Sequence, residues 1–175
     1  MPTKSTALRN SQIGNLVANL DSLELIDGSS NVIATGSGIS WGTASSGSVS
    51  PSSDISLSGN ANAGGGTDAA TARFFDSGAS GEEISGLNVG QDQNVGTWSN
   101  GTSYQVGDKV SNGGRTFEAT EAHTADSSNE PGVGDSWPDF WDEIHILLDN
   151  TNITDGQTIN LPSSSATLTE PADTQ

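Results

Sequence analysis

The residues best suited to proton transfer or transition-metal binding in this 175-residue sequence are two histidines, His123 and His145. Neither belongs to an H-x-x-x-H or H-E-x-x-H spacing, and the sequence contains no cysteine. Such spacings place two ligands beside one metal ion, whereas His145 in E-I-H-I is typical of an alternating strand. We therefore predict no transition-metal centre, no thiol chemistry and no cofactor.

Carboxylates are the next candidates, because a glycosidase needs two of them about 5 to 10 Å apart across a cleft. Acidic residues lie close together at Glu82 and Glu83, and again at Asp139, Asp142 and Glu143. A cleft needs a larger scaffold than one or two small domains offer. We predict that these carboxylates solvate the surface, that no residue is catalytic and that the protein is not an enzyme.

One stretch of the sequence is rich in the oxygen ligands that Ca²⁺ prefers. It contains Asp149, Asn150, Asn152 and Asp155, without the spacing of an EF-hand. We predict no metal site, with Ca²⁺ in this stretch as the alternative.

The charge of the chain excludes several partners. Asp and Glu total 22 against 5 Lys and Arg, which gives a net charge of −17. Phosphate backbones and anionic lipid surfaces repel such a chain, so we expect no nucleic acid and no membrane as partners. The excess of Asp over Glu and the presence of two lysines resemble proteins from organisms that live in molar salt. At that ionic strength the Debye length is about 3 Å, so repulsion between acidic side chains is largely screened. An ordinary acidic surface is the alternative. No export signal is recognisable.

Few apolar residues are available for the core of the elements that would position a site. Leu, Ile, Val and Phe total 33 of 175 residues. That ratio favours an all-β fold with small side chains. Such a fold is expected to gain stability from contacts with neighbouring subunits. The patterns predict a helix at 6–20 capped by Ser5 or Thr6, hairpins at 23–36 and 70–90, and strands at 38–43 and 54–59. We interpret this as a Ser/Gly-rich β-sandwich with a short N-terminal helix.

The middle of the chain has a different character. Six of its nine aromatic residues fall within 44 positions: Trp98, Tyr104, Phe117, Trp137, Phe140 and Trp141. The composition of 146–175 then resumes that of 1–92. We predict one discontinuous domain, 1–92 plus 146–175, interrupted by an inserted domain at 95–145.

Turn residues divide the inserted segment into three short strands. Asn100-Gly101, Gly107-Asp108 and the glycines at 113–114 mark the turns. We predict a three-stranded meander in which Val106, Val110 and Phe117 face inward with Trp98 and Tyr104.

The order W, Y-x-x-G-D-x-V, G-x-x-F-x-A, A-H-T, E-P and a final W resembles carbohydrate-binding modules of families 5 and 12, the chitin-binding type 3 fold. The matching residues are Trp98, Tyr104, Gly107, Asp108, Val110, Gly114, Phe117, Ala119, His123, Thr124, Glu130, Pro131 and Trp141 or Trp137. The resemblance implies structural roles for Trp98, Gly107, Asp108, Phe117, His123 and Pro131. It also implies glycan binding by exposed aromatic rings, which stack on pyranose faces.

Two places where that family commonly carries exposed aromatics are altered in this sequence. They read Thr120-Glu121-Ala122 and Ser128-Asn129. The remaining candidates for a carbohydrate platform are Trp137, Phe140, Trp141 and Tyr104. The alternative is that these rings close and cover the core of the inserted domain, which would then be a spacer or a protein-docking knob.

The flanking segments look like small virion proteins of tailed viruses, with their N-terminal A-L-R-N helix and A-R-F-F-D-S hairpin. This implies a non-enzymatic capsid decoration or turret subunit on the outer surface of the virion, displaying the inserted domain to host-surface glycans. The implied partners are the major capsid protein or other virion proteins and further copies of the chain, as trimers or pentamers. The alternatives are a tail or fibre component, or a secreted chitin- or glycan-binding module.

Overall fold

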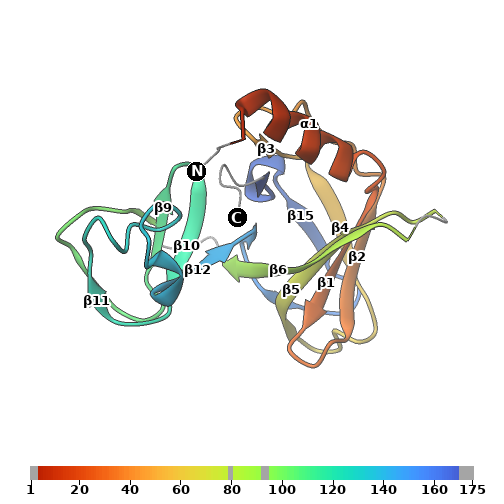
Figure 1. The fold of residues 1–175 in the computed structure, drawn as a ribbon. Coiled ribbons are helices and arrows are strands. Elements are labelled where there is room, and N and C mark those ends of the chain that lie inside the picture. The colour runs from red at the N-terminus through yellow and green to blue at the C-terminus, as the bar shows by residue number, and fades with distance from the viewer. Residues whose placement is uncertain (1–3, 79–80, 92–94, 170–175) are drawn as a thin grey trace.

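The computed structural model describes residues 4–78, 81–91 and 95–169 as an all-β molecule with one α-helix, α1 (Figure 1). Within those ranges, no helix is both long and apolar enough to span a membrane. The elements outside the aromatic segment are α1 (Thr6–Val17), β1 (Ser22–Asp27), β2 (Val32–Ser37), β3 (Ser48–Val49), β4 (Ile55–Gly59), β5 (Thr67–Phe75), β6 (Glu83–Gln91), β13 (Ile146–Leu148), β14 (Asn152–Ile153), β15 (Thr158–Leu161), the 3₁₀ turn η2 (Ser163–Ser165) and β16 (Leu168–Thr169).

Helix α1 begins where the sequence predicts and ends earlier. The Ser5 hydroxyl accepts a hydrogen bond from the Leu8 backbone N–H at 3.2 Å, so Ser5 is the N-cap. Ile13 and Val17 are buried on the inner side of the helix. Leu20 lies beyond the helix but joins the same core, which explains why its spacing extended the predicted helix to residue 20.

The main sheet contains both predicted hairpins. Seven of its eight strands run in the order β13-β6-β5-β1-β2-β4-β15, and the eighth, β14, pairs with β5. The β1–β2 and β5–β6 pairs are antiparallel hairpins, and β4 matches the strand predicted at 54–59. The strand predicted at 38–43 is absent, because this segment contributes an isolated bridge, Trp41 with Pro51, and no ladder. The sheet is curved in Figure 1, with α1 across one end.

The core enclosed by this sheet consists mainly of aliphatic side chains around Phe74. Phe74 is fully buried, and the half-buried Trp41 meets it edge-on with ring centroids 4.9 Å apart. The Trp41 indole N–H donates to the Leu20 carbonyl at 2.7 Å. Trp41 therefore covers the core from a segment that lacks regular structure.

The aromatic segment forms a second, smaller hydrophobic cluster. Its elements are β7 (Gly96–Thr97), β8 (Ser103–Tyr104), β9 (Lys109–Asn112), β10 (Arg115–Ala119), β11 (His123–Thr124), the 3₁₀ turn η1 (Trp137–Asp139) and β12 (Trp141–Ile144). The antiparallel meander β9-β10-β12 is joined by a fourth strand, β7, parallel to β9, and β8 pairs with β11. Val106 was predicted to face inward and instead is 67% exposed, because it lies in the turn before β9.

The two clusters meet at His145, between β12 and β13. The His145 backbone N–H donates to the Asn88 carbonyl at 3.0 Å, and the Asn88 amide donates to the Glu143 carbonyl at 3.0 Å. Ile146 then pairs with Val89 in the parallel β6–β13 ladder. The chain thus returns to the strand that it left at Gln91, and the predicted division into two domains stays a prediction.

Candidate functional site

The candidate site is an aromatic face built by η1 and the residue that follows it. Trp137 and Phe140 are both half-buried and pack against the smaller cluster. Pro138 lies in the first turn, where its fixed φ suits a helical start, and the Phe140 N–H donates to the Trp137 carbonyl at 3.0 Å. The short turn therefore holds two aromatic rings three residues apart at the surface.

Trp137 is held by contacts from β10. Its ring meets Phe117 edge-on at a centroid distance of 5.5 Å, and the Arg115 guanidinium lies 5.8 Å from its centroid. Glu143 binds Arg115 through two hydrogen bonds, of which the one from Nε to Oε1 is 2.7 Å long. A guanidinium fixed in this way orients the indole by a cation–π contact.

Phe140 is supported by His123. Their ring centroids are 4.9 Å apart, and the His123 ring also lies 4.8 Å from Trp141. His123 Nδ1 is hydrogen-bonded to the Glu121 carbonyl at 2.8 Å. His123 thus packs between aromatic rings and is fixed to the backbone on its other side.

Tyr104 and Trp141 belong to the core and present no free ring face. Tyr104 is 7% exposed and Trp141 is 1% exposed. The Tyr104 hydroxyl accepts from the Ser99 N–H at 2.9 Å, and the Trp141 indole N–H donates to the Asn129 carbonyl at 2.9 Å. A ring that stacks on a sugar needs an open face, so these two residues are withdrawn as platform candidates.

The other motif residues shape the chain around this core. Gly107 has φ of +89°, a conformation that favours glycine, and its N–H donates to the Ala119 carbonyl at 2.9 Å. Asp108 accepts a hydrogen bond from the Gln105 N–H at 2.8 Å, which closes the same turn. Trp98 is half-buried against the cluster, and Pro131 is buried, with its carbonyl accepting from the Asn112 amide at 3.0 Å.

A polar groove on the aromatic segment was not predicted from the sequence. It has a volume of about 290 Å³ and is lined by Gly96, Thr97, Thr102, Ser103, Tyr104, Asp108, Lys109 and Val110. Lys109 is paired with Glu118 at 3.2 Å. Single hydroxyl residues from β7, β8 and the loop between them carry no motif, so no pattern in the sequence marks this groove.

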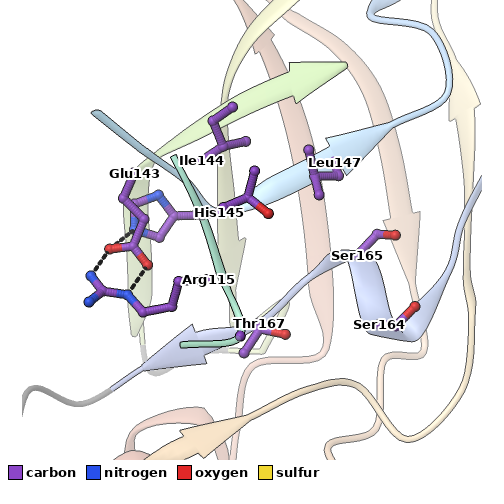
Figure 2. Close-up of a pocket in the computed structure, with 10 residues that line it drawn as sticks. Arg115, Glu143, Ile144, His145, Leu147, Ser164, Ser165 and Thr167 are labelled. Atoms are coloured by element: carbon purple, nitrogen blue, oxygen red, sulfur yellow. Dashed lines mark hydrogen bonds and ion pairs between the residues drawn. The ribbon is translucent and has the colours of Figure 1, made fainter. Parts of the chain in front are cut away.

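The cavity between the two clusters suits water more than a sugar. It holds about 40 Å³ and is lined by Arg115, Glu143 and His145 on one side and by Ser164, Ser165 and Thr167 on the other (Figure 2). His145 Nε2 lies 3.9 Å from the Glu143 carboxylate. One or a few waters fill such a volume, so the cavity offers no room for a pyranose ring.

Burial lowers the pKa of His145, and the neighbouring Glu143 opposes this shift while Arg115 adds to it. As pH falls, the His145 imidazole therefore takes up a proton more readily in the unfolded chain than in the folded protein. The free energy of unfolding consequently falls as pH drops below about 6.5. We expect urea unfolding to show a smaller loss of stability between pH 7.5 and 5.5 for His145→Gln than for the wild type. Equal losses would show that His145 does not drive this dependence.

In the ranges that the structure describes, no three His, Asp or Glu residues gather as metal ligands. In the stretch considered for Ca²⁺, the Asn150 side-chain oxygen accepts from the Asn152 N–H at 3.0 Å. The Asn152 amide donates to Asp68 at 3.1 Å. The Asn150 oxygen thus closes the loop, and the Asn152 amide joins it to β5.

Comparison with known proteins found one family whose model matches the aromatic segment. Residues 97–141 match the family model of carbohydrate-binding module family 5/12. No curated protein and no solved structure matches the chain. The match spans about a quarter of the sequence and includes every element from β8 to η1, so a carbohydrate-binding module is indicated for this segment.

Proposed function

We propose that the chain binds a glycan without catalysis, through Trp137 and Phe140 of the family 5/12 segment. The observation that carries the proposal is that Trp137 and Phe140 stay partly open to solvent on one short turn, whereas Tyr104 and Trp141 are buried. Partly open rings offer the flat apolar face on which a pyranose stacks.

The contacts around the two rings support this assignment. Arg115, Phe117 and His123 fix Trp137 and Phe140 before any ligand arrives. A fixed ring loses little conformational entropy on binding, which favours affinity from a small contact. The net charge of −17 disfavours polyanionic glycans, so a neutral polymer such as chitin is the expected class.

The Trp137→Ala variant tests the proposal. We expect at least a tenfold loss of affinity for chitohexaose by titration calorimetry, about 1.4 kcal/mol or more, and loss of retention on chitin beads. Val106→Ala is the matched control, because it removes an exposed apolar side chain from the same segment outside the aromatic face. Unchanged retention of Trp137→Ala would reject Trp137 as part of a glycan platform.

For the whole chain we propose a structural role in a virion, as a capsid decoration or turret subunit that displays this segment outward. The thin apolar content supports assembly, since burial against neighbouring subunits adds area that one copy lacks. Repeated display would also let weak glycan sites add up. A tail or fibre location and a secreted glycan-binding module are the alternatives.

Finding the chain by mass spectrometry in purified intact particles, beside a major capsid protein, would support the virion role. A stable monomer that is secreted and binds chitin would favour the secreted module instead.

A further inference from the structure

The sequence contains the pattern Asn-x-Ser/Thr, with x other than proline, at two places. They are Asn100-Gly101-Thr102 and Asn152-Ile153-Thr154. This pattern is the acceptor for N-linked glycosylation, in which a sugar is attached to the asparagine side chain. Because both the asparagine and the hydroxyl residue define the pattern, a transferase must reach both side chains at once. The surroundings of the two places therefore decide which of them can be an acceptor in the folded protein.

The first acceptor pattern lies in an open turn between β7 and β8. Asn100, Gly101 and Thr102 are all exposed. Apart from the chain neighbours of Gly101, no protein atom lies within 4 Å of the position that a Cβ would take on this glycine. Within the part of the chain that the structure describes, neither the Asn100 amide nor the Thr102 hydroxyl is hydrogen-bonded to the protein. Both side chains that define the pattern are therefore accessible to an enzyme.

Backbone hydrogen bonds fix this turn on the outer side of the aromatic segment. The Gly101 N–H donates to the Ala125 carbonyl at 2.8 Å, and the Ala125 N–H donates to the Thr102 carbonyl at 2.8 Å. Ala125 directly follows β11, which lies away from the main sheet in Figure 1. The polar groove of about 290 Å³ has Thr102 in its lining, so open space adjoins the turn. The turn thus combines a fixed backbone with room for a sugar chain.

The second acceptor pattern is held in the main sheet by all three of its residues. Ile153 is fully buried in β14, and the Asn152 side-chain amide donates to Asp68 at 3.1 Å. The Thr154 hydroxyl donates to the Gln157 side-chain oxygen at 3.2 Å. A transferase reaches these groups only after β14 separates from β5, with which it pairs. The second pattern is therefore closed in the folded protein and serves as an internal comparison for the first.

We propose that Asn100 of the folded chain is a site of N-linked glycosylation. The donor is a sugar whose anomeric carbon is bonded to a phosphate oxygen, as in a nucleotide sugar or a lipid-linked oligosaccharide. The Asn100 Nδ2 gives up one proton and bonds to the anomeric carbon, while the bond from that carbon to the phosphate oxygen breaks. The phosphate leaves with the electron pair, and nothing is oxidised or reduced. The inference does not depend on glycan binding by Trp137 and Phe140.

Peptide mass spectrometry of the chain purified from the cells or particles that produce it tests the proposal. We expect the peptide with Asn100 to carry the added mass of one or more sugar residues. We expect modification of Asn152 to be roughly tenfold rarer or absent, because β14 must first open locally. An unmodified Asn100 would overturn the proposal. Equal modification of both asparagines would also overturn it, since the acceptor would then be the unfolded chain.

Variants made in the same cells assign the added mass to this pattern. We expect Asn100→Gln and Thr102→Ala to lose it, although Thr102→Ala keeps the asparagine that would carry the sugar. Thr102→Ser keeps the hydroxyl and is expected to keep the modification. Asn152→Gln is the matched control and should also keep it, with unchanged circular dichroism confirming that each variant folds. A Thr102→Ala variant that stays modified at Asn100 would overturn recognition of this pattern.

Two cell-free reactions distinguish the two kinds of donor. In one, unmodified recombinant chain is incubated with the soluble fraction of the producing cells and uridine diphosphate glucose. In the other, the same chain is incubated with the membrane fraction, which contains any lipid-linked oligosaccharide. Transfer to Asn100 in the first reaction identifies a nucleotide sugar as the donor, and transfer in the second identifies a lipid-linked donor. Transfer in neither reaction would overturn the proposal that the folded chain is an acceptor.

Discussion

The Trp141→Ala variant is expected to lose the folded structure of the aromatic segment. Trp141 is 1% exposed, meets Tyr104 edge-on at 5.1 Å and donates its indole N–H to the Asn129 carbonyl. Truncating a buried tryptophan costs about 3 to 5 kcal/mol through the cavity that it leaves, and the lost hydrogen bond adds about 1 kcal/mol. A cluster with six buried residues has a small free energy of unfolding, so a loss of this size is expected to unfold it.

The matched comparison is Trp137→Ala, which removes the same residue type from the surface of the same cluster. We expect Trp137→Ala to lose chitin retention with a nearly unchanged urea midpoint, and Trp141→Ala to lose both retention and near-ultraviolet circular dichroism. If Trp141→Ala unfolds at the wild-type urea concentration, Trp141 is not the anchor of the cluster.

Local signals in the sequence predicted most of the regular structure. Ser5 caps α1 because its hydroxyl reaches the Leu8 N–H, a contact within four residues. The β1–β2 hairpin follows from turn residues between two alternating runs, and Asp27 accepts from the N–H groups of Ser29 and Asn31, both at 2.8 Å. Interactions between residues within four positions of each other can be predicted from residue spacing alone.

Pairing between distant segments was not predictable in the same way. The parallel β6–β13 ladder joins Val89 to Ile146 across the whole inserted segment, and neither strand carries a mark of its partner. Trp41 was assigned to a strand from its apolar neighbours, whereas its edge contact with Phe74 fixes it without a ladder. The structure at such positions depends on packing between residues that are distant in the sequence. The alternation of apolar and polar residues gives no information about that packing.

The candidate site could be predicted as a set of residue types but not as a surface. Aromatic rings serve both cores and sugar platforms, so the sequence analysis placed Tyr104 in the predicted core and still kept it among the platform candidates with Trp137, Phe140 and Trp141. Their separation comes from partners outside their own strands, as with the Asn129 carbonyl that holds Trp141 inside. The three-dimensional arrangement leaves Trp137 and Phe140 as the partly open members of these four candidates.

The Phe74→Ala variant is expected to have the corresponding effect on the larger cluster. Phe74 is fully buried near the C-terminal end of β5, which lies between β1 and β6, and Trp41 packs on its ring. Its removal should cost about 3 to 5 kcal/mol, a large part of the stability of a domain this size. Loss of far-ultraviolet helical signal from α1 would report the loss of this core.

Combining Phe74→Ala with Trp141→Ala decides whether the two clusters are energetically independent. Distant sites without shared partners add to within about 0.5 kcal/mol, so independent domains predict additive losses in urea unfolding and two separate transitions. The hydrogen bonds between Asn88 and the segment Glu143–His145 are the route by which one cluster can support the other. If each single variant lowers both transitions together, that junction couples the clusters, and the discontinuous two-domain division is wrong.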